Sequence, residues 1–295
     1  MRYSQVIGSM IVLIAVASGN GCRIGSPFRS PAERAPVLFK AAPDLGALVN
    51  AINANTAEVR QVSCDIQIRM DGVPPLSGTL IVEKPRRMRL KAGVIGISEM
   101  GIDVGSNDEE FWVWNKSAFG GQAPAIYFAK HNEFAESSLR QSIPFEPQWI
   151  IDALGLLSLE QNGSIQGPFV RSDGRYVLRT VTQTRNGSVT KDLVVDSKTG
   201  LVQQQAIYDA SMRLIAYSNA VEHQYFPEFH ASLPRQIELV VNGPDGRPNS
   251  LTVNLAGHEI NKLYGDPDRQ WSMPKPSDAQ WVDLAKTTAA TIQAP

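Results

Sequence analysis

Histidine and cysteine, the side chains best suited to metal binding and nucleophilic chemistry, are scarce in this chain. Its 295 residues include four histidines and two cysteines. Glu222 precedes His223 and Glu228 lies two residues before His230, but no HExxH, CxxC or facial-triad spacing accompanies them. Pro227 interrupts this segment, so we expect a solvated loop between strands. The pattern predicts neither a metal site nor a cofactor.

Serine, glycine and carboxylate patterns give no catalytic signature either. No GxSxG elbow occurs, and residues 105–108 (Gly-Ser-Asn-Asp) are typical of a turn. Glu109 and Glu110 are neighbours and would point to opposite faces of a strand, unlike a glycosidase pair. The net charge of −1 provides no electrostatic basis for binding nucleic acid. We expect a protein that is not an enzyme; a hydrolase or metal-dependent enzyme would require its histidines to converge with carboxylates in one cleft.

The N-terminus has the pattern of an export signal. Arg2 precedes an apolar run, Val6–Ala17, that is too short to cross a bilayer as a helix. Cys22 follows small residues and resembles the bacterial lipobox, in which signal peptidase II cuts before a cysteine that carries diacylglycerol. The position three before the cysteine is usually Leu, and here it is Gly19. The resemblance implies a signal peptide over 1–21 and a lipid anchor at Cys22, with an unlipidated secreted protein as the alternative.

The second cysteine, Cys64, falls on the apolar face of an alternating strand. If lipid consumes Cys22, Cys64 remains as a buried, inert thiol. A Cys22–Cys64 disulfide is the competing interpretation, because exported proteins usually pair their cysteines. Residues 22–43 contain four prolines and are expected to form a tether, since about 20 flexible residues span roughly 25 Å.

Hydrophobic periodicity predicts two amphipathic helices and a long series of strands. Asp44 can cap a helix that ends near Asn55, and a second helix is expected over Glu146–Leu157. Period-2 alternation predicts antiparallel strands with one apolar and one solvated face. The expected strands are Val62–Met70, Leu76–Glu83, Met88–Ala92, Ile102–Val104, Glu110–Trp114, Tyr176–Thr184, Val189–Asp196, Leu201–Tyr208, Arg213–Ser218, Gln236–Val241 and Ser250–Leu255. This order favours a mainly β (α+β) domain, with a highly curved sheet whose concave apolar face is covered by the helices.

The strand Phe111–Trp114 is unusually aromatic, and Trp149 lies in the second predicted helix. Two interpretations remain open at this point. The aromatic residues form ordinary core, or they line an apolar cavity that accepts an acyl chain.

Two segments resemble the periplasmic lipoprotein carriers LolA and LolB. Residues 78–90 read Gly-Thr-Leu-Ile-Val-Glu-Lys-Pro and continue into a basic and apolar strand, and residues 103–114 end in the aromatic strand. Shorter matches occur at 196–201, 208–209 and 233–237. The resemblance covers residues 44–275 and implies a half-open antiparallel barrel of about ten or eleven strands, with a helical lid over an apolar cavity. Residues 276–295 follow as an extended tail.

In those families such cavities bind acyl chains, so the resemblance implies a membrane-anchored lipoprotein that binds a lipid or lipoprotein acyl chain in envelope trafficking. The candidate cavity wall consists of Ile66, Ile68, Leu80, Val82, Met88, Leu90, Phe111, Trp112, Trp114 and Trp149. The expected partners are the membrane, a hydrophobic ligand and an envelope protein. The carriers also use an arginine and a protruding hydrophobic loop in lipoprotein transfer, and the sequence does not place either.

Arg23, instead of Asp, follows the cysteine, which favours an outer-membrane location facing the periplasm. The alternative function is a structural or interaction lipoprotein whose sheet is filled by its own side chains. A void of several hundred Å³ on the concave face would favour ligand binding, and a solid core would favour the alternative.

Overall fold

One large sheet dominates the computed structural model, which describes residues 34–116, 123–141, 146–160, 164–184, 187–243, 247–262 and 266–287. The predicted signal peptide, Cys22 and the first part of the predicted tether lie outside these ranges. Fourteen strands are hydrogen-bonded in the order β16-β6-β5-β4-β3-β2-β1-β15-β14-β11-β10-β9-β8-β7. Every pairing is antiparallel except that of β16 with β6.

The strands of this sheet are β1 (Gln61–Met70), β2 (Val73–Glu83), β3 (Arg87–Val94), β4 (Ile97–Ser106), β5 (Glu110–Asn115), β6 (Ala125–Lys130), β7 (Ile165–Val170), β8 (Tyr176–Thr184), β9 (Gly187–Val195), β10 (Val202–Tyr208), β11 (Leu214–Val221), β14 (Gln236–Asn242), β15 (Pro248–Ile260) and β16 (Gln280–Asp283). A separate hairpin pairs β12 (Gln224–Phe226) with β13 (Ala231–Leu233).

Local chemistry explains the well-defined strands and turns. Along β1, buried Cys64, Ile66 and Ile68 alternate with more exposed residues, as a sheet with one covered face requires. Between β9 and β10, the Asp196 carboxylate accepts hydrogen bonds from the backbone N–H groups of Lys198 and Thr199. Gly200, with φ of +72°, then completes this turn in a conformation that glycine adopts without steric cost.

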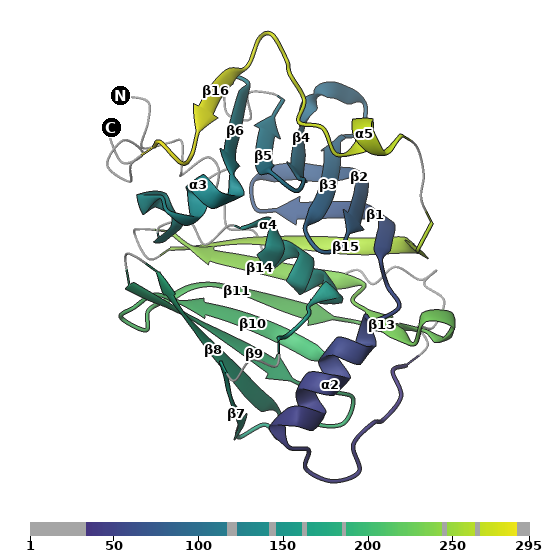
Figure 1. Cartoon of the computed structure of the whole chain (residues 1–295). Helices are drawn as coiled ribbons and strands as arrows, with labels where there is room; N and C mark the ends of the chain where they lie inside the picture. Colours follow the sequence, from purple (N-terminus) through teal and green to yellow (C-terminus); the bar gives the residue numbers. More distant parts are fainter. Residues whose placement is uncertain are drawn as a thin grey trace.

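The helices α2 (Leu45–Asn55), α3 (His131–Ala135) and α4 (Pro147–Ile151) lie on one face of the sheet, which curves around them (Figure 1). Asp44 caps α2 by accepting a 2.7 Å hydrogen bond from the Ala47 N–H. The predicted helix over 146–157 is shorter than expected, because α4 passes into a π-helical turn, η3 (Asp152–Leu156). Gly155, with φ of +82°, lies inside that turn. The remaining short helices are η2 (Ser138–Gln141), η4 (Pro227–Phe229) and α5 (Pro267–Gln270).

Two apolar clusters fill the concave face. The larger combines the inward side chains of β1–β6, β10, β11, β14 and β15 with α3, α4 and η3. The smaller packs Leu48, Val49 and Ile52 of α2 against β8 and β9. No helix among the described residues is long and apolar enough to span a membrane.

The predicted curved, mainly β fold is confirmed, but the predicted strand number of ten or eleven was too low and the sheet does not close into a barrel. Its two edges are β7 and β16. The segment expected to be an extended tail contributes β16, which lies beside β6, and Leu284 after it is 2% exposed.

Candidate functional site

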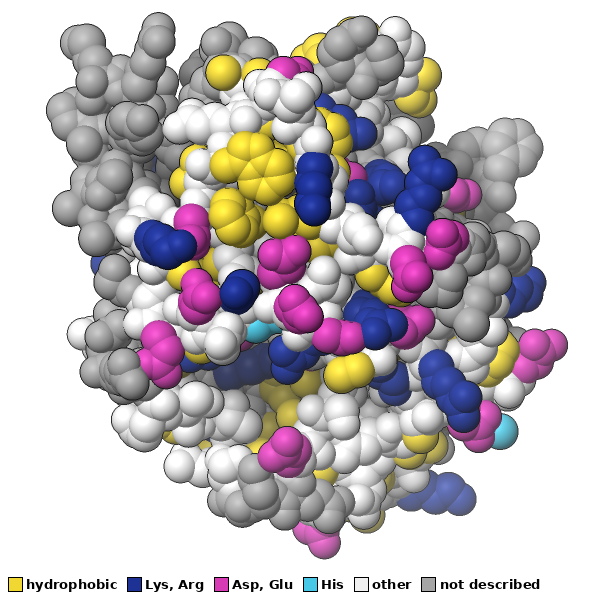
Figure 2. Space-filling model, turned by 45° about the horizontal axis from the view of Figure 1, so that its top comes forward, with side chains coloured by type: hydrophobic (Ala, Val, Ile, Leu, Met, Phe, Trp, Pro, Cys, Tyr) yellow, Lys and Arg dark blue, Asp and Glu magenta, His cyan; other side chains and the backbone are white. Residues whose placement is uncertain are grey.

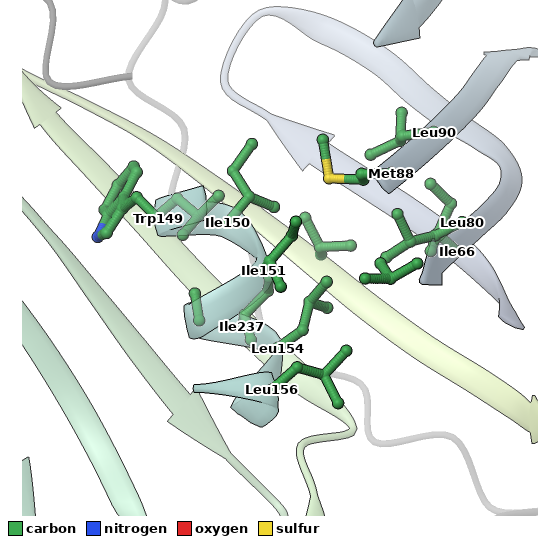
Figure 3. Close-up of a cluster of buried hydrophobic side chains, with 14 of the residues drawn as sticks. Ile66, Leu80, Met88, Leu90, Trp149, Ile150, Ile151, Leu154, Leu156 and Ile237 are labelled. Atoms are coloured by element: carbon green, nitrogen blue, oxygen red, sulfur yellow. The ribbon is translucent and has the colours of Figure 1, made fainter. Parts of the chain in front are cut away.

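Residues 147–157, comprising α4, η3 and Leu157, form a segment that we call the lid. Its apolar side chains enter the concave face of the sheet. Figure 3 shows Ile150, Ile151 and Leu154 directed toward the strands that carry Ile66, Leu80, Met88 and Leu90. Ile151 is fully buried, and Leu156 is 3% exposed. The lid therefore fills the concave face of the sheet with its own side chains.

The predicted cavity-wall residues divide between the two faces of the sheet. Eight of them belong to the large apolar cluster beneath the lid: Ile66, Ile68, Leu80, Val82, Met88, Leu90, Phe111 and Trp149. The concave face thus brings together residues from β1, β2, β3, β5 and α4.

Trp112 and Trp114 do not line the concavity. Successive side chains of a strand point to opposite faces, so both tryptophans lie opposite Phe111 and Val113 on β5. Trp112 Nε1 donates to Asp103 Oδ1 over 3.3 Å, and the Arg89 guanidinium lies 4.9 Å from the Trp112 ring centre. These contacts belong to the outer face of the sheet and correct the prediction for this strand.

A small cavity remains between the end of the lid and the strands β1, β2 and β15. Its volume is about 10 Å³, which is room for about one water molecule. Its lining is almost entirely apolar: Val62, Cys64, Leu80, Val82, Leu154, Leu156, Leu233, Pro234, Leu255 and His258. In this conformation the concave face is filled by the protein itself.

Cys64 is a free, buried thiol in the wall of this cavity. Burial, with a smaller contribution from the neighbouring Asp65 charge, raises the pKa of Cys64 to about 12. Because the thiolate is the reactive form, this cysteine is inert at neutral pH. Its place agrees with the role predicted from the sequence, that of a small hydrophobic residue.

Side-chain amides at the end of α2 bind the segment that follows the lid and the strand β13. The Asn53 amide donates to Leu159 O (2.9 Å) and accepts from Leu159 N–H (2.8 Å). Asn55 makes the same pair of bonds with the backbone of Ser232 in β13. Each side-chain amide donates one hydrogen bond to a backbone residue and accepts one from it, as a neighbouring strand does in a β-sheet. The end of α2 therefore connects two segments that are distant in sequence.

An ion pair joins the lid to the floor of the concave face. Lys191 Nζ of β9 lies 2.6 Å from Asp152 Oδ2, and the two side chains are 24% and 7% exposed. Gln148, one turn earlier in the lid, donates to Asp152 Oδ1 over 2.9 Å. The sequence analysis did not single out these residues. Because Lys191 lies between the polar residues Thr190 and Asp192, the sequence alone indicates a residue on a solvated face.

The histidines do not assemble a metal centre. Among the described residues, no group of three or more His, Cys, Asp or Glu side chains has suitable geometry. Burial lowers the pKa of His223 to about 4 and also lowers the pKa of His258, which lines the cavity. His230 is exposed, and its Nδ1 atom lies 3.6 Å from Glu58 Oε1. The segment between β11 and β14 is the small hairpin β12–β13 in place of the expected loop.

One exposed apolar tip was also missed. Ile95 and Ile97, at the turn between β3 and β4, are 83% and 43% exposed. Figure 2 shows that hydrophobic side chains gather at the surface on the face turned toward the viewer. The alternating pattern of β3 gave no signal for the tip, because the turn itself breaks the period.

Comparison of the sequence with protein-family models finds no match, and comparison with curated proteins finds no relative. Several solved structures are similar. A LolA superfamily protein from Nitrosomonas europaea is 13% identical, with a TM-score of 0.46 over 79% of this chain and 99% of that one. A DUF1329 family protein from Desulfovibrio piger is 13% identical, with a TM-score of 0.46 over 75% and 95%.

A third similar structure is a putative outer membrane lipoprotein-sorting protein domain from Vibrio parahaemolyticus. It is 11% identical, with a TM-score of 0.39 over 75% of this chain and 94% of that one.

Proposed function

We propose that this chain is a lipid-anchored protein of the bacterial envelope that binds an elongated hydrophobic ligand between its curved sheet and its lid. The observation that carries the proposal is the lid itself. Its apolar side chains pack into a concave face that is lined by aliphatic side chains from several strands. An acyl chain entering there would replace lid side chains with methylene groups of similar character.

The lid has little structure of its own to resist such an exchange. The helix α4 has five residues, and the π-helical turn after it also has five. Isolated helices shorter than about 12 residues are marginal in water, so the conformation of the lid depends on the burial of its apolar side chains. A ligand that buries the same apolar surface of the sheet competes with the lid side chains. It therefore removes the contacts that hold the lid in this conformation.

The free energies of the two states are comparable. The five buried Ile and Leu side chains of the lid contribute on the order of 8–15 kcal/mol, at roughly 1.5–3 kcal/mol each. An acyl chain with 14 methylenes contributes about 11 kcal/mol at about 0.8 kcal/mol per CH₂. The exchange is therefore close to balanced, which suits a protein that must both take up and release its ligand.

The test uses the full chain with Cys22→Ser, which prevents lipidation. We expect saturable binding when this protein is titrated with a fluorescent fatty acid below its micelle concentration. As a second variant, Leu154→Glu weakens the apolar contact between the lid and the sheet, which competes with the ligand, and should strengthen binding. If the Cys22→Ser chain shows no saturable binding, the proposal fails.

A second candidate function is structural, and one specific observation favours it. The cavity of about 10 Å³ is far below the several hundred Å³ of an open ligand site. A permanently filled core would suit an envelope protein that acts through its surface. The same titration separates the two functions, because a permanently filled core binds no fatty acid.

The anchor at Cys22 and the outer-membrane location belong to the proposal. When the chain is expressed with its own leader in bacteria, the wild type should sediment with membranes and Cys22→Ser should appear in the soluble periplasmic fraction. Retention of Cys22→Ser on membranes would contradict the lipid anchor and leave the ligand site to be judged on its own test.

A further inference from the structure

A polar group lies under the lid in the middle of the otherwise apolar concave face. It consists of Lys191 on β9, Gln205 on β10 and Ser218 on β11. Gln205 is directly opposite Ser218 in the β10–β11 pair, and Lys191 is opposite Ile207, two residues along β10 from Gln205. Side chains two residues apart on a strand share a face, so Lys191 and Gln205 are diagonal neighbours.

Two features of this group are unusual for a protein core. Gln205 is 2% exposed, and among the described residues its Oε1 atom has no hydrogen-bond partner. A buried acceptor without a donor is unfavourable, and it makes this place a poor surface for an acyl tail. The Lys191 ammonium is compensated by Asp152, which is carried by the lid.

Opening of the lid therefore has an electrostatic consequence. When the lid leaves the concave face, Asp152 leaves with it and Lys191 remains on a largely apolar surface without its counter-ion. The Lys191 side chain is already 24% exposed with the lid in place, so after opening its ammonium is compensated by water or by another anion. A purely apolar ligand cannot restore the compensation, whereas a ligand with an anionic group can.

We infer that the ligand is an anionic amphiphile whose negatively charged head group takes the place of the Asp152 carboxylate at Lys191. This inference rests on the proposed function and deepens it. A carboxylate or a phosphate oxygen accepts the hydrogen bonds that Lys191 Nζ now donates to Asp152. The acyl chain then runs along the aliphatic strands toward Met88 and Leu90, where lid residues now pack.

The test compares probes of one chain length on variants of the Cys22→Ser chain. The probes are palmitate, methyl palmitate and palmitoyl lysophosphatidylglycerol, each below its micelle concentration. Lys191→Met removes the ammonium and keeps the length of the side chain. We expect it to weaken at least one anionic probe by about tenfold or more, the usual effect of losing a charge-assisted hydrogen bond, and to leave methyl palmitate within about twofold. Whether palmitate or the lysophospholipid responds distinguishes a carboxylate head from a phosphate head.

Asp152→Asn is the reciprocal variant. It removes the charge that competes with the head group, so it should strengthen binding of the anionic probe and change methyl palmitate little. If Asp152→Asn strengthens the binding of palmitate and of methyl palmitate equally, the ion pair only holds the lid on the sheet. This result would overturn the inference. Equal affinities of acid and ester for the unaltered protein would overturn it as well.

Arg179→Met is the matched control. Arg179 pairs with Asp192 at 2.7 Å, and Asp192 adjoins Lys191 in β9 but points to the opposite face of the sheet. This variant should bind every probe as the unaltered protein does, and selective loss of the anionic probe here would contradict the assignment to Lys191. Absence of binding by all three probes would contradict the proposed function itself, so the two failures are distinguishable.

Discussion

At the scale of single residues, burial determines the ionisation of the few reactive side chains. Cys64 is kept as a thiol, with a pKa raised to about 12, and His223 is kept neutral, with a pKa lowered to about 4. Both shifts arise mainly from removal of the side chain from water. Cys64 is therefore not in the thiolate form that a nucleophilic cysteine uses at neutral pH.

The stability of the folded chain should depend on pH through His223. Its folded pKa of about 4 lies below the ordinary value of 6.5, so between these values the unfolded chain binds more protons. The free energy of unfolding therefore falls as the pH is lowered from 6.5 toward 4. His223→Asn should reduce this slope in urea unfolding, whereas His230→Asn, at a side chain that is 72% exposed, should leave it unchanged. Equal slopes in all three proteins would contradict the prediction.

Residue-level prediction from the sequence succeeded where a side chain follows a strong period. The strands carrying Ile66 and Leu80 alternate clearly, so their apolar faces were assigned correctly. It failed at Trp112 and Trp114, because an aromatic strand with both faces buried or partly buried has no period to assign them. It also missed Lys191, because its partner lies 39 residues earlier and nothing local indicates the contact.

At the scale of elements, the end of α2 connects the segment that follows the lid to the small hairpin β12–β13. Asn53 and Asn55 each pair with a backbone peptide group, of Leu159 and Ser232 respectively. Both contacts connect residues more than 100 positions apart in sequence. The sequence analysis treated these asparagines only as residues that end the helix, and the geometry adds this second role.

Loss of one of these contacts should be measurable as stability. Asn53→Ala leaves the N–H and C=O groups of Leu159 without their partner, which costs about 1–3 kcal/mol. Urea unfolding should show this decrease, and Asn132→Ala, at an exposed position of α3, should change stability little. An unchanged midpoint for Asn53→Ala would mean that water replaces the amide without loss.

The elements missed by the sequence analysis have physical explanations. The strand β6 is apolar on both faces, with Ala125, Ile126, Tyr127 and Ala129 all buried, so no period-2 signal marks it. The strand β7 contains Gly167 and Pro168, which argue against a strand in sequence. The strands β12, β13 and β16 have three or four residues each and are too short for any periodic pattern.

At the scale of the whole molecule, the sheet is open, and its two edges must be protected from pairing with other chains. Pro168 lies in the edge strand β7. The other edge is formed by β16, a four-residue strand near the end of the described chain. This strand covers β6, and the following Leu284 is buried against the large apolar cluster.

A chain that ends at residue 275, the predicted end of the domain, should therefore be less stable than the full chain and more prone to self-association. It would lack β16 and Leu284 and would expose the edge of β6. We expect a lower unfolding midpoint and concentration-dependent association in sedimentation experiments. A truncated chain that remains monomeric with unchanged stability would show that the domain ends where the sequence predicted.

The central claim, that an acyl chain replaces the lid on the concave face, has a direct spectroscopic test. Of the five tryptophans, only Trp149 belongs to the lid and packs in the large apolar cluster. Displacement of the lid moves this indole from the core toward water, which shifts its fluorescence emission to longer wavelength. The account predicts a saturable red shift when fatty acid is added to the Cys22→Ser protein, and loss of that shift in the additional variant Trp149→Phe. Saturable binding without a red shift, or an equal shift with and without Trp149, would contradict it.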